Sequence, residues 1–255
     1  MLLRVVGCHG GETPRHRTTA FVVDDVLAID AGSLTSGLDL PAQYRLRACL
    51  IGHAHLDHIR DLATISDNRC QKGCPPLVVA ATRGTLRALK KYFFNGVLWP
   101  DFTQIPSEAS PTIQLLELKR GVPTTVAGFE VTAIPVTHTI ESSGFLIARG
   151  RAALGFTGDT GPTDRFWEVM AAEPRLRGLL AEVSFPNRLQ RLATDSGHHT
   201  PRSLGADLRK SPSPGALPTL LYHMKPAYLA EIERECARLR LPNLSTLRLD
   251  EELVL

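Results

Sequence analysis

The sequence predicts an α/β protein built from two similar halves, each a sheet with helices on one face. Apolar segments of strand length alternate with segments of helical periodicity, and a run of several strands in succession begins at Thr112. No low-complexity tract or obvious linker interrupts the 255 residues, of which 43% are hydrophobic and 22% charged. We therefore expect residues 1–255 to form a single domain that buries a sizeable core.

The individual elements follow from runs of apolar and β-branched residues and from the turn residues between them. Gly10, Gly11 and Pro14 separate the first two strands, and Asn95 and Gly96 end the first long helix. The expected strands cover residues 2–6, 19–23, 26–29, 44–51, 77–80, 114–118, 124–126, 129–135, 144–149, 152–157, 178–182 and 219–222. The expected helices cover residues 82–94, 164–172, 202–210 and 227–239, and the Pro- and Ser-rich stretch 211–215 is typical of a loop.

Side chains with metal-binding chemistry follow the strand expected at 44–51. His53, His55, Asp57 and His58 lie within six residues. Side chains alternate along an extended chain, so His53 and His55 share one side, while Asp57 and His58 fall where the chain turns. A solvated turn explains this cluster less well, because polar groups just after an apolar strand usually need partners. The segment therefore predicts a loop that serves two adjacent metal ions.

Four further residues of the same chemistry stand at the ends of other strands. They are Asp30 after VLAI, His138 after AIPVT, Asp159 after LGFTG, and His223 after TLLY. Taken singly, the aspartates are typical of turns and the histidines of buried, hydrogen-bonded imidazoles. Strand ends from both halves can converge on one edge of a sheet sandwich, so together the four residues favour a shared metal site.

Composition limits the remaining possibilities. The net charge of +3 is too small and dispersed to indicate a nucleic-acid-binding surface. No apolar run reaches the roughly 18 residues of a membrane span, and the N-terminus lacks a secretory signal pattern, so we expect a cytoplasmic protein without membrane contact. The five cysteines are irregularly spaced, as reduced thiols are. Cys70 and Cys74 have the spacing of half a metal site or a disulfide, but no second pair accompanies them.

The histidine cluster and the strand-end residues resemble, in their order, the five motifs of the metallo-β-lactamase fold. The resemblance spans nearly the whole chain. It implies a four-layer αβ/βα sandwich, with two mixed sheets, helices on the outer faces and a binuclear metal site at one edge. It also implies the ligands by position: His53, His55 and His138 for one ion, Asp57, His58 and His223 for the other, with Asp159 bridging both and Asp30 orienting a ligand from behind.

Finer motifs resemble the class II cyclic-nucleotide phosphodiesterases. These motifs are GCHGGE, LAIDAGSLTSGL, AEVSFPN, SGHHTP and YHMKP. The resemblance implies a 3′,5′-cyclic nucleotide as substrate, a homodimer, and a role for His198 in donating to the leaving oxygen or binding a phosphoryl oxygen. Arg60 and Asp61 depart from the family, which usually has Gly a few residues after its HxHLDH motif, and their effect on the shape of the pocket is left open. His199 replaces a usual Leu, and it either contacts substrate or lies outside the site.

The ligand set predicts metal-dependent hydrolysis of a phosphodiester. Two divalent ions would lower the pKa of a shared water and neutralise charge in the transition state, so no serine or cysteine nucleophile is needed. Imidazole-rich ligands favour Zn²⁺, with Mn²⁺ or Fe²⁺ as alternatives. Asp57 would also accept the proton of the nucleophile, and Lys225 is a candidate phosphate contact. The aromatic residues between 92 and 102 provide either a stacking lid for a purine or part of the core.

Two other functions remain open. A transfer-RNA 3′-processing endonuclease of the same superfamily shares the HxHxDH motif and a GDTGPTD-like segment. However, only 20 residues separate His138 from Asp159. That leaves no space for an RNA-gripping arm, so we do not expect a nucleic-acid partner. The second alternative is a non-catalytic, metal-binding scaffold.

Overall fold

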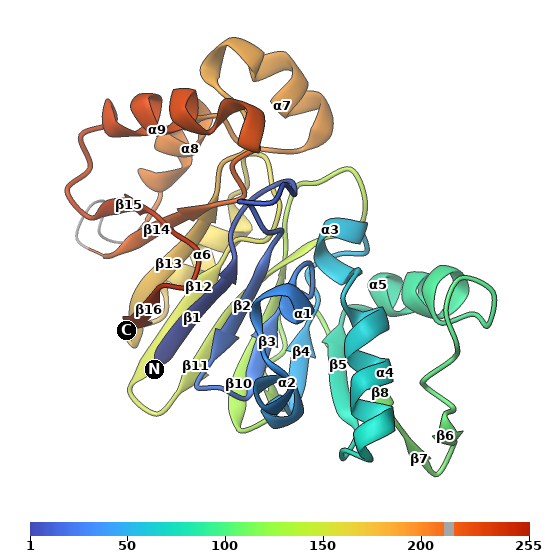
Figure 1. Cartoon of the computed structure of the whole chain (residues 1–255). Helices are drawn as coiled ribbons and strands as arrows, with labels where there is room; N and C mark the ends of the chain where they lie inside the picture. The colour runs from blue at the N-terminus through green and yellow to red at the C-terminus, as the bar shows by residue number, and fades with distance from the viewer. Residues whose placement is uncertain (212–216) are drawn as a thin grey trace.

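Two seven-stranded mixed sheets face each other in the computed structural model, which describes residues 1–211 and 217–255 (Figure 1). The first sheet has the order β16-β1-β2-β3-β4-β5-β8. Its strands are β16 (Glu252–Val254), β1 (Leu2–Gly7), β2 (Ala20–Val23), β3 (Leu27–Ile29), β4 (Ala48–Leu50), β5 (Leu77–Ala81) and β8 (Ile113–Glu117). The second sheet consists of β15 (Leu244–Thr246), β14 (Thr219–Tyr222), β13 (Leu176–Glu182), β12 (Ala152–Phe156), β11 (Ser143–Arg149), β10 (Phe129–Pro135) and β9 (Thr124–Val126).

Each sheet changes from antiparallel to parallel pairing part-way across. In the first sheet β16, β1, β2 and β3 pair antiparallel, and β3, β4, β5 and β8 pair parallel. In the second sheet β9 to β12 pair antiparallel, and β12 to β15 pair parallel. This shared pattern confirms the prediction of two similar halves. A short hairpin of β6 (Pro106–Ser107) and β7 (Ser110–Pro111) stands apart from both sheets.

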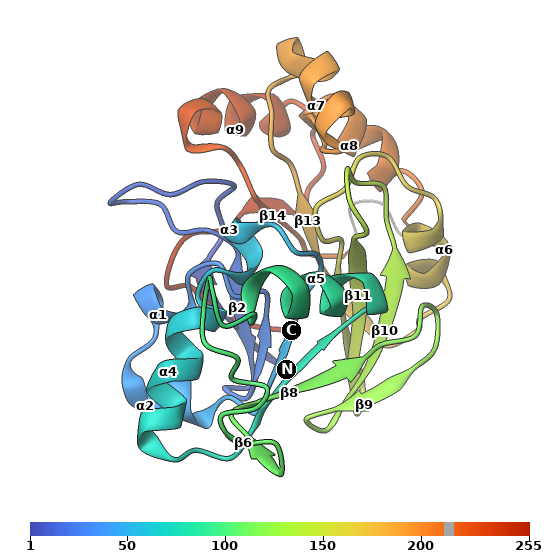
Figure 2. The ribbon, with the colours of Figure 1, turned by 90° about the vertical axis from the view of Figure 1, so that its right-hand side faces the viewer.

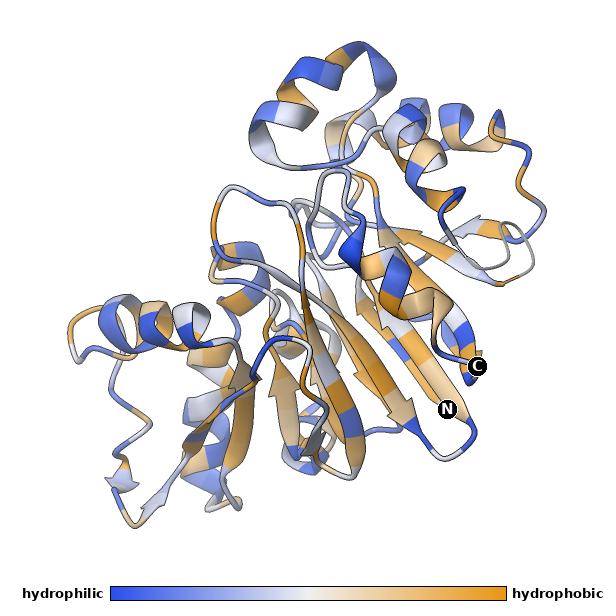
Figure 3. Ribbon diagram, turned by 180° about the vertical axis from the view of Figure 1, so that it is seen from behind, coloured by the Kyte–Doolittle hydropathy of each residue, from blue (hydrophilic) through white to orange (hydrophobic). Residues whose placement is uncertain are grey.

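Helices cover the outer face of each sheet (Figure 2). The first sheet carries α1 (Leu34–Gly37), α2 (Leu40–Arg45), α3 (Leu56–Ile59), α4 (Leu62–Lys72), α5 (Arg83–Ala88) and a π-helical turn at Leu89–Phe93. The second carries α6 (Arg165–Ala171), α8 (Pro201–Leu208) and α9 (Leu229–Ala237), while α7 (Gln190–Ser196) and the 3-10 turns Asn187–Leu189 and Pro226–Tyr228 lie in the connections. Figure 3 shows the apolar residues concentrated on the strands.

The buried apolar residues form three layers, which define the four-layer sandwich. One layer joins the two sheets and contains Phe21, Phe145, Phe156 and Tyr222. A second lies between the first sheet and its helices, and a third lies between the second sheet and α6, α8 and α9. The predicted αβ/βα architecture is therefore confirmed.

The segment predicted as a strand at 44–51 is partly helical, and that prediction is wrong at its start. The side chain of Asp39 accepts a hydrogen bond from the Ala42 backbone, and Pro41 occupies the first turn, so α2 extends to Arg45 before β4 begins. The apolar run concealed these helix-start signals. The predicted helix at 82–94 is present, although its last turn is π-helical. Of the loop predicted at 211–215, only Ser211 lies within the described residues.

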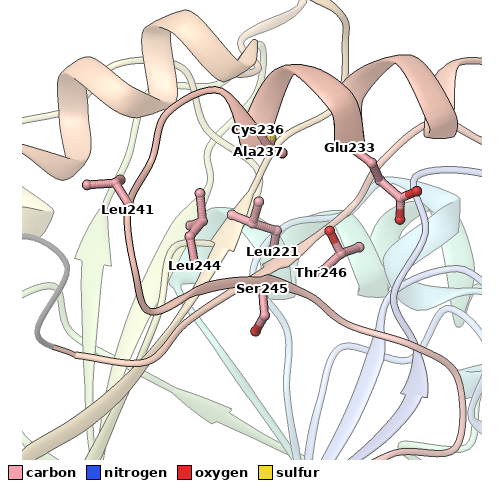
Figure 4. A pocket seen from close by; sticks show the side chains of 8 residues that line it. All are labelled: Leu221, Glu233, Cys236, Ala237, Leu241, Leu244, Ser245 and Thr246. Carbon is pink, nitrogen blue, oxygen red and sulfur yellow. The ribbon is translucent and has the colours of Figure 1, made fainter.

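The aromatic stretch lies mainly in the core rather than over a site. Phe93, Phe94 and Phe102 are buried between the first sheet and its helices, whereas Tyr92 is exposed. A small cavity of about 130 Å³ lies between α9 and the strands β14 and β15 (Figure 4). All five cysteine thiols are free. None of the helices in the described ranges has both the length and the apolar character that a membrane crossing requires.

Candidate metal centre

The histidine segment begins where β4 leaves the first sheet. Asp30 fixes the start of this segment, because its Oδ1 accepts a hydrogen bond from the backbone N–H of Gly52 (2.9 Å). The chain then stays extended until His55, which precedes the first turn of α3. As predicted, His53 and His55 share one side: His53 Nε2 and His55 Nδ1 are 2.9 Å apart. Asp57 and His58 lie in α3, so the predicted turn is a short helix.

One group of candidate ligands joins the two halves of the molecule. His53, His55 and His138 offer donor atoms that all lie within 4.8 Å of one another. His138 Nδ1 donates a hydrogen bond to the carbonyl oxygen of Gly197 (2.9 Å), which leaves Nε2 available as a ligand. Burial lowers the pKa of all three imidazoles. They are therefore neutral near pH 7, the form that binds a metal.

A second group lies beside the first and consists of Asp57, His58, Asp159 and His223. Asp159 Oδ2 is its centre, at 3.0 Å from His58 Nε2 and 3.1 Å from His223 Nε2. The same oxygen is 3.9 Å from His53 Nε2 in the first group. Asp159 is thus the carboxylate that faces both groups, and Asp57 Oδ2 approaches His223 Nε2 at 3.4 Å on the more exposed side.

Asp30 supports this second group from behind. Its Oδ2 accepts a hydrogen bond from His58 Nδ1 (2.7 Å), which directs His58 Nε2 toward Asp159. Asp30 and His223 both follow strands, and both adopt the left-handed backbone region, with φ of 56° and 67°.

The electrostatics of the second group suit a cation. Burial acts to lower the pKa of His58, but the carboxylates of Asp159 and Asp30 outweigh it and raise this pKa well above its ordinary value. Burial acts to raise the pKa of Asp159, but His223 and His58 hold it well below its ordinary value. The group therefore stabilises positive charge at its centre. Asp159 Oδ1 and His223 Nε2 are also buried without a hydrogen-bond partner within the described chain. A bound divalent ion would satisfy both the charge and these atoms.

His198 lies at the border of the two groups. It offers a donor atom within 4.8 Å of those of His138 and Asp159, and its ring centroid is 5.0 Å from that of His138. The turn that delivers it needs Gly197, which ends α7 in the left-handed region (φ 67°). A Cβ atom on Gly197 would lie only 2.8 Å from His138 Cα. The glycine of the SGHHTP motif thus permits His198 to reach the ligands.

Two buried residues behind His198 were not predicted from the sequence. Glu182 ends β13, and its Oε1 accepts a hydrogen bond from His198 Nδ1 (3.0 Å). Ser184 donates to Glu182 Oε2 (3.1 Å) and also contacts His223 Nδ1 (2.9 Å). Burial raises the pKa of Glu182 to about 7. The signal was a carboxylate at the end of an apolar strand, the same pattern that marked Asp30 and Asp159.

The other predicted residues separate into those near the centre and those away from it. The Lys225 ammonium lies 6.0 Å from the ring centroid of Phe185, whose ring in turn contacts His198. His199 is buried instead among residues of α8, with Nδ1 3.0 Å from Ser203 Oγ and Nε2 3.6 Å from Asp207 Oδ2. This placement does not favour a substrate contact for His199.

The side chain of Asp61 binds residues of the first sheet's helical layer and is in neither group of candidate ligands. It is buried, and its Oδ2 accepts hydrogen bonds from the backbone and the side chain of Thr35, both at 2.7 Å. Arg60 points to the N-terminal loop, where it forms an ion pair with Glu12. Arg60 and Asp61 therefore bind α3 to the N-terminal loop and to α1.

Comparisons with known proteins agree with this geometry. A family model described as "Beta-lactamase superfamily domain" matches residues 29–218. The chain is 27% identical to a Yersinia pestis protein named "Probable 3′,5′-cyclic-nucleotide phosphodiesterase", over 88% of this chain and 78% of that protein. It is 26% identical to an Aliivibrio fischeri protein named "3′,5′-cyclic-nucleotide phosphodiesterase", over 74% of this chain and 69% of that protein. The crystal structure of unliganded yeast PDE1 has the same fold, with a TM-score of 0.82, 19% identity and coverage of 100% and 99%.

Proposed function

The chain belongs to the β-lactamase superfamily, and from that premise we propose that it is a metal-dependent phosphodiesterase that hydrolyses 3′,5′-cyclic nucleotides to 5′-monophosphates. The observation that carries the proposal is the pair of ligand groups that face each other across Asp159. The names of the two relatives, both cyclic-nucleotide phosphodiesterases, support the choice of substrate.

The residues present fit two divalent ions. His53, His55 and His138 would hold one ion, Asp57, His58 and His223 the other, and Asp159 would serve both. The predominance of imidazole favours Zn²⁺, while the carboxylates leave Mn²⁺ and Fe²⁺ as alternatives. When bound, the two ions supply Lewis acidity and a nucleophilic water for attack on phosphorus.

Side chains of the protein would accept and donate the protons of the reaction. Asp57 Oδ2 lies on the more exposed side of the ligand groups, where it would accept the proton of the nucleophile. Doubly protonated His198 would donate its Nε2 proton to the ribose 3′-oxygen as the bond from phosphorus to that oxygen breaks, which leaves the phosphate on the 5′-carbon and the neutral imidazole hydrogen-bonded to Glu182. Glu182 accepts from His198 Nδ1 and so would present the other ring nitrogen to the substrate. Lys225, close to Phe185 beside His198, would contact the phosphate.

A substrate panel with identified products tests this proposal. The metal-loaded protein is incubated with cyclic AMP, cyclic GMP, a 2′,3′-cyclic nucleotide and precursor transfer RNA. We expect 5′-AMP or 5′-GMP to form from the 3′,5′-cyclic substrates. His55→Ala should abolish this turnover, whereas His16→Ala should retain it, because His16 contacts Thr13 and His9 in the N-terminal loop and belongs to neither ligand group.

Three outcomes would contradict the proposal. Cleavage of precursor transfer RNA without turnover of cyclic nucleotides would favour the endonuclease. A metal-loaded protein that is inert to every phosphodiester would favour the scaffold. Full activity of His55→Ala would contradict the assignment of His55 as a metal ligand.

A further inference from the structure

A cavity of about 480 Å³ lies at the end of the first sheet opposite the candidate metal centre. Its walls include the connection from α2 to β4, Pro75 and Pro76 before β5, and Ala127 in the turn between β9 and β10. The cavity segments lead into the N-terminal ends of β4 and β5, whereas the histidine segment leaves the C-terminal end of β4. The cavity and the candidate metal centre therefore lie at opposite ends of these strands (Figure 1). The volume is within the range of small-molecule sites, about 300–1,000 Å³.

Three arginines line this cavity, and no acidic residue does. Arg45 and Arg47 are exposed, and Arg69 is only 1% exposed. Within residues 1–211 and 217–255 none of the three forms an ion pair with a carboxylate. The cavity is therefore a concentration of uncompensated positive charge.

Arg69 makes this charge unusual because it is buried. Its guanidinium donates to the carbonyl oxygens of Gln43 (2.8 Å), Tyr44 (3.2 Å) and Pro75 (2.8 Å), while Nε has no partner. The carbonyl groups fix the position of the guanidinium, but they carry no net charge. Burial without a counter-ion lowers the pKa of Arg69. A buried charge of this kind is costly unless it is paired, so an anion bound in the cavity would stabilise it.

We infer that this cavity binds a small organic phosphate at a site separate from the candidate metal centre. Planar guanidinium groups match the geometry of phosphate oxygens, and three of them suit a dianionic phosphate monoester. The remaining walls, which include Tyr44, Leu46 and the two prolines, would contact the organic part of the ligand. This inference does not depend on the proposed hydrolase activity.

Calorimetric titration of the metal-loaded protein with inorganic phosphate and with AMP tests the site. The test variant is R45Q/R47Q, since both side chains are exposed and their replacement should not disturb the fold. The matched control is R238Q, an exposed arginine without an ion pair that follows α9. Any phosphate bound at the metal centre is common to all three proteins.

We expect the wild type and R238Q to show a binding component for AMP that R45Q/R47Q weakens about tenfold or more. Superimposable isotherms for the wild type and R45Q/R47Q would overturn the site. A Y44A variant distinguishes the organic phosphate from the free ion: it should weaken AMP binding more than phosphate binding. Equal effects of Y44A on the two ligands would overturn the assignment to an organic phosphate.

Discussion

Replacement of Glu182 by Gln is the most informative change behind the candidate metal centre. Glu182 accepts from His198 Nδ1 at 3.0 Å and from Ser184 Oγ at 3.1 Å, and Gln keeps its shape while removing its charge. A hydrogen bond to a charged group contributes about 1.5–3 kcal/mol and a neutral one about 0.5–1.5 kcal/mol. The difference of about 1–1.5 kcal/mol predicts a kcat lower by about 5- to 13-fold. KM and metal content should stay near wild type.

Steady-state kinetics with a cyclic nucleotide at pH 8, where the Glu182 carboxyl is mostly ionised, measures this effect. Asp207→Asn is the matched control, because Asp207 is another buried carboxylate but lies beside His199 and Trp167. It should leave kcat unchanged. If Glu182 acts through His198, the double variant E182Q/H198A should be no slower than H198A. Independent effects that multiply in the double variant would refute the reasoning.

Three further predictions follow from the same contacts. Asp30→Ala frees the imidazole that it orients, so metal affinity measured by chelator competition should fall about 10- to 100-fold. Gly197→Ala should lower both the free energy of unfolding and the turnover. Its control is Gly73→Ala, because Gly73 also ends a helix with a similar φ but has open space around it. This control should lose only about 1–2 kcal/mol of unfolding free energy, measured in urea, and should keep its turnover. Burial lowers the pKa of His9 to about 4 from 6.5, so the unfolded chain binds more protons between these values and stability falls as the pH falls. Urea unfolding at pH 7 and pH 5 should show a loss of stability that is smaller by about 1–2 kcal/mol in His9→Gln than in the wild type. An identical loss in the two proteins would contradict this contribution of His9.

The sequence predicts which candidate ligands come together, because their spacing is local or tied to strand ends. His53 and His55 alternate along one extended segment, and Asp30, Asp159 and His223 each follow a strand whose apolar run is easily recognised. Parallel strands place their carboxyl ends at one edge, so convergence follows from the order of the elements. The role of these residues as ligands stays a prediction until a metal is measured, as do the homodimer and the cytoplasmic location.

The sequence does not predict contacts that depend on which way a side chain turns. Glu182 belongs with His198, but 15 residues and the whole of α7 separate them in the chain. His199 adjoins His198, yet it turns toward α8 because Ser203 and Asp207 offer buried partners there. Helix α4 was also not predicted, because its polar residues give no clear apolar stripe and packing on the first sheet decides its structure.

Titration of the metal-free protein with Zn²⁺ tests the central claim most directly, with cyclic-nucleotide turnover followed at each addition. The two ligand groups predict that activity rises to a plateau at two equivalents of Zn²⁺ per chain. In Asp159→Asn the plateau should not be reached, because the carboxylate that faces both groups is lost. A plateau at one equivalent, or turnover that persists in excess chelator, would contradict a two-metal centre.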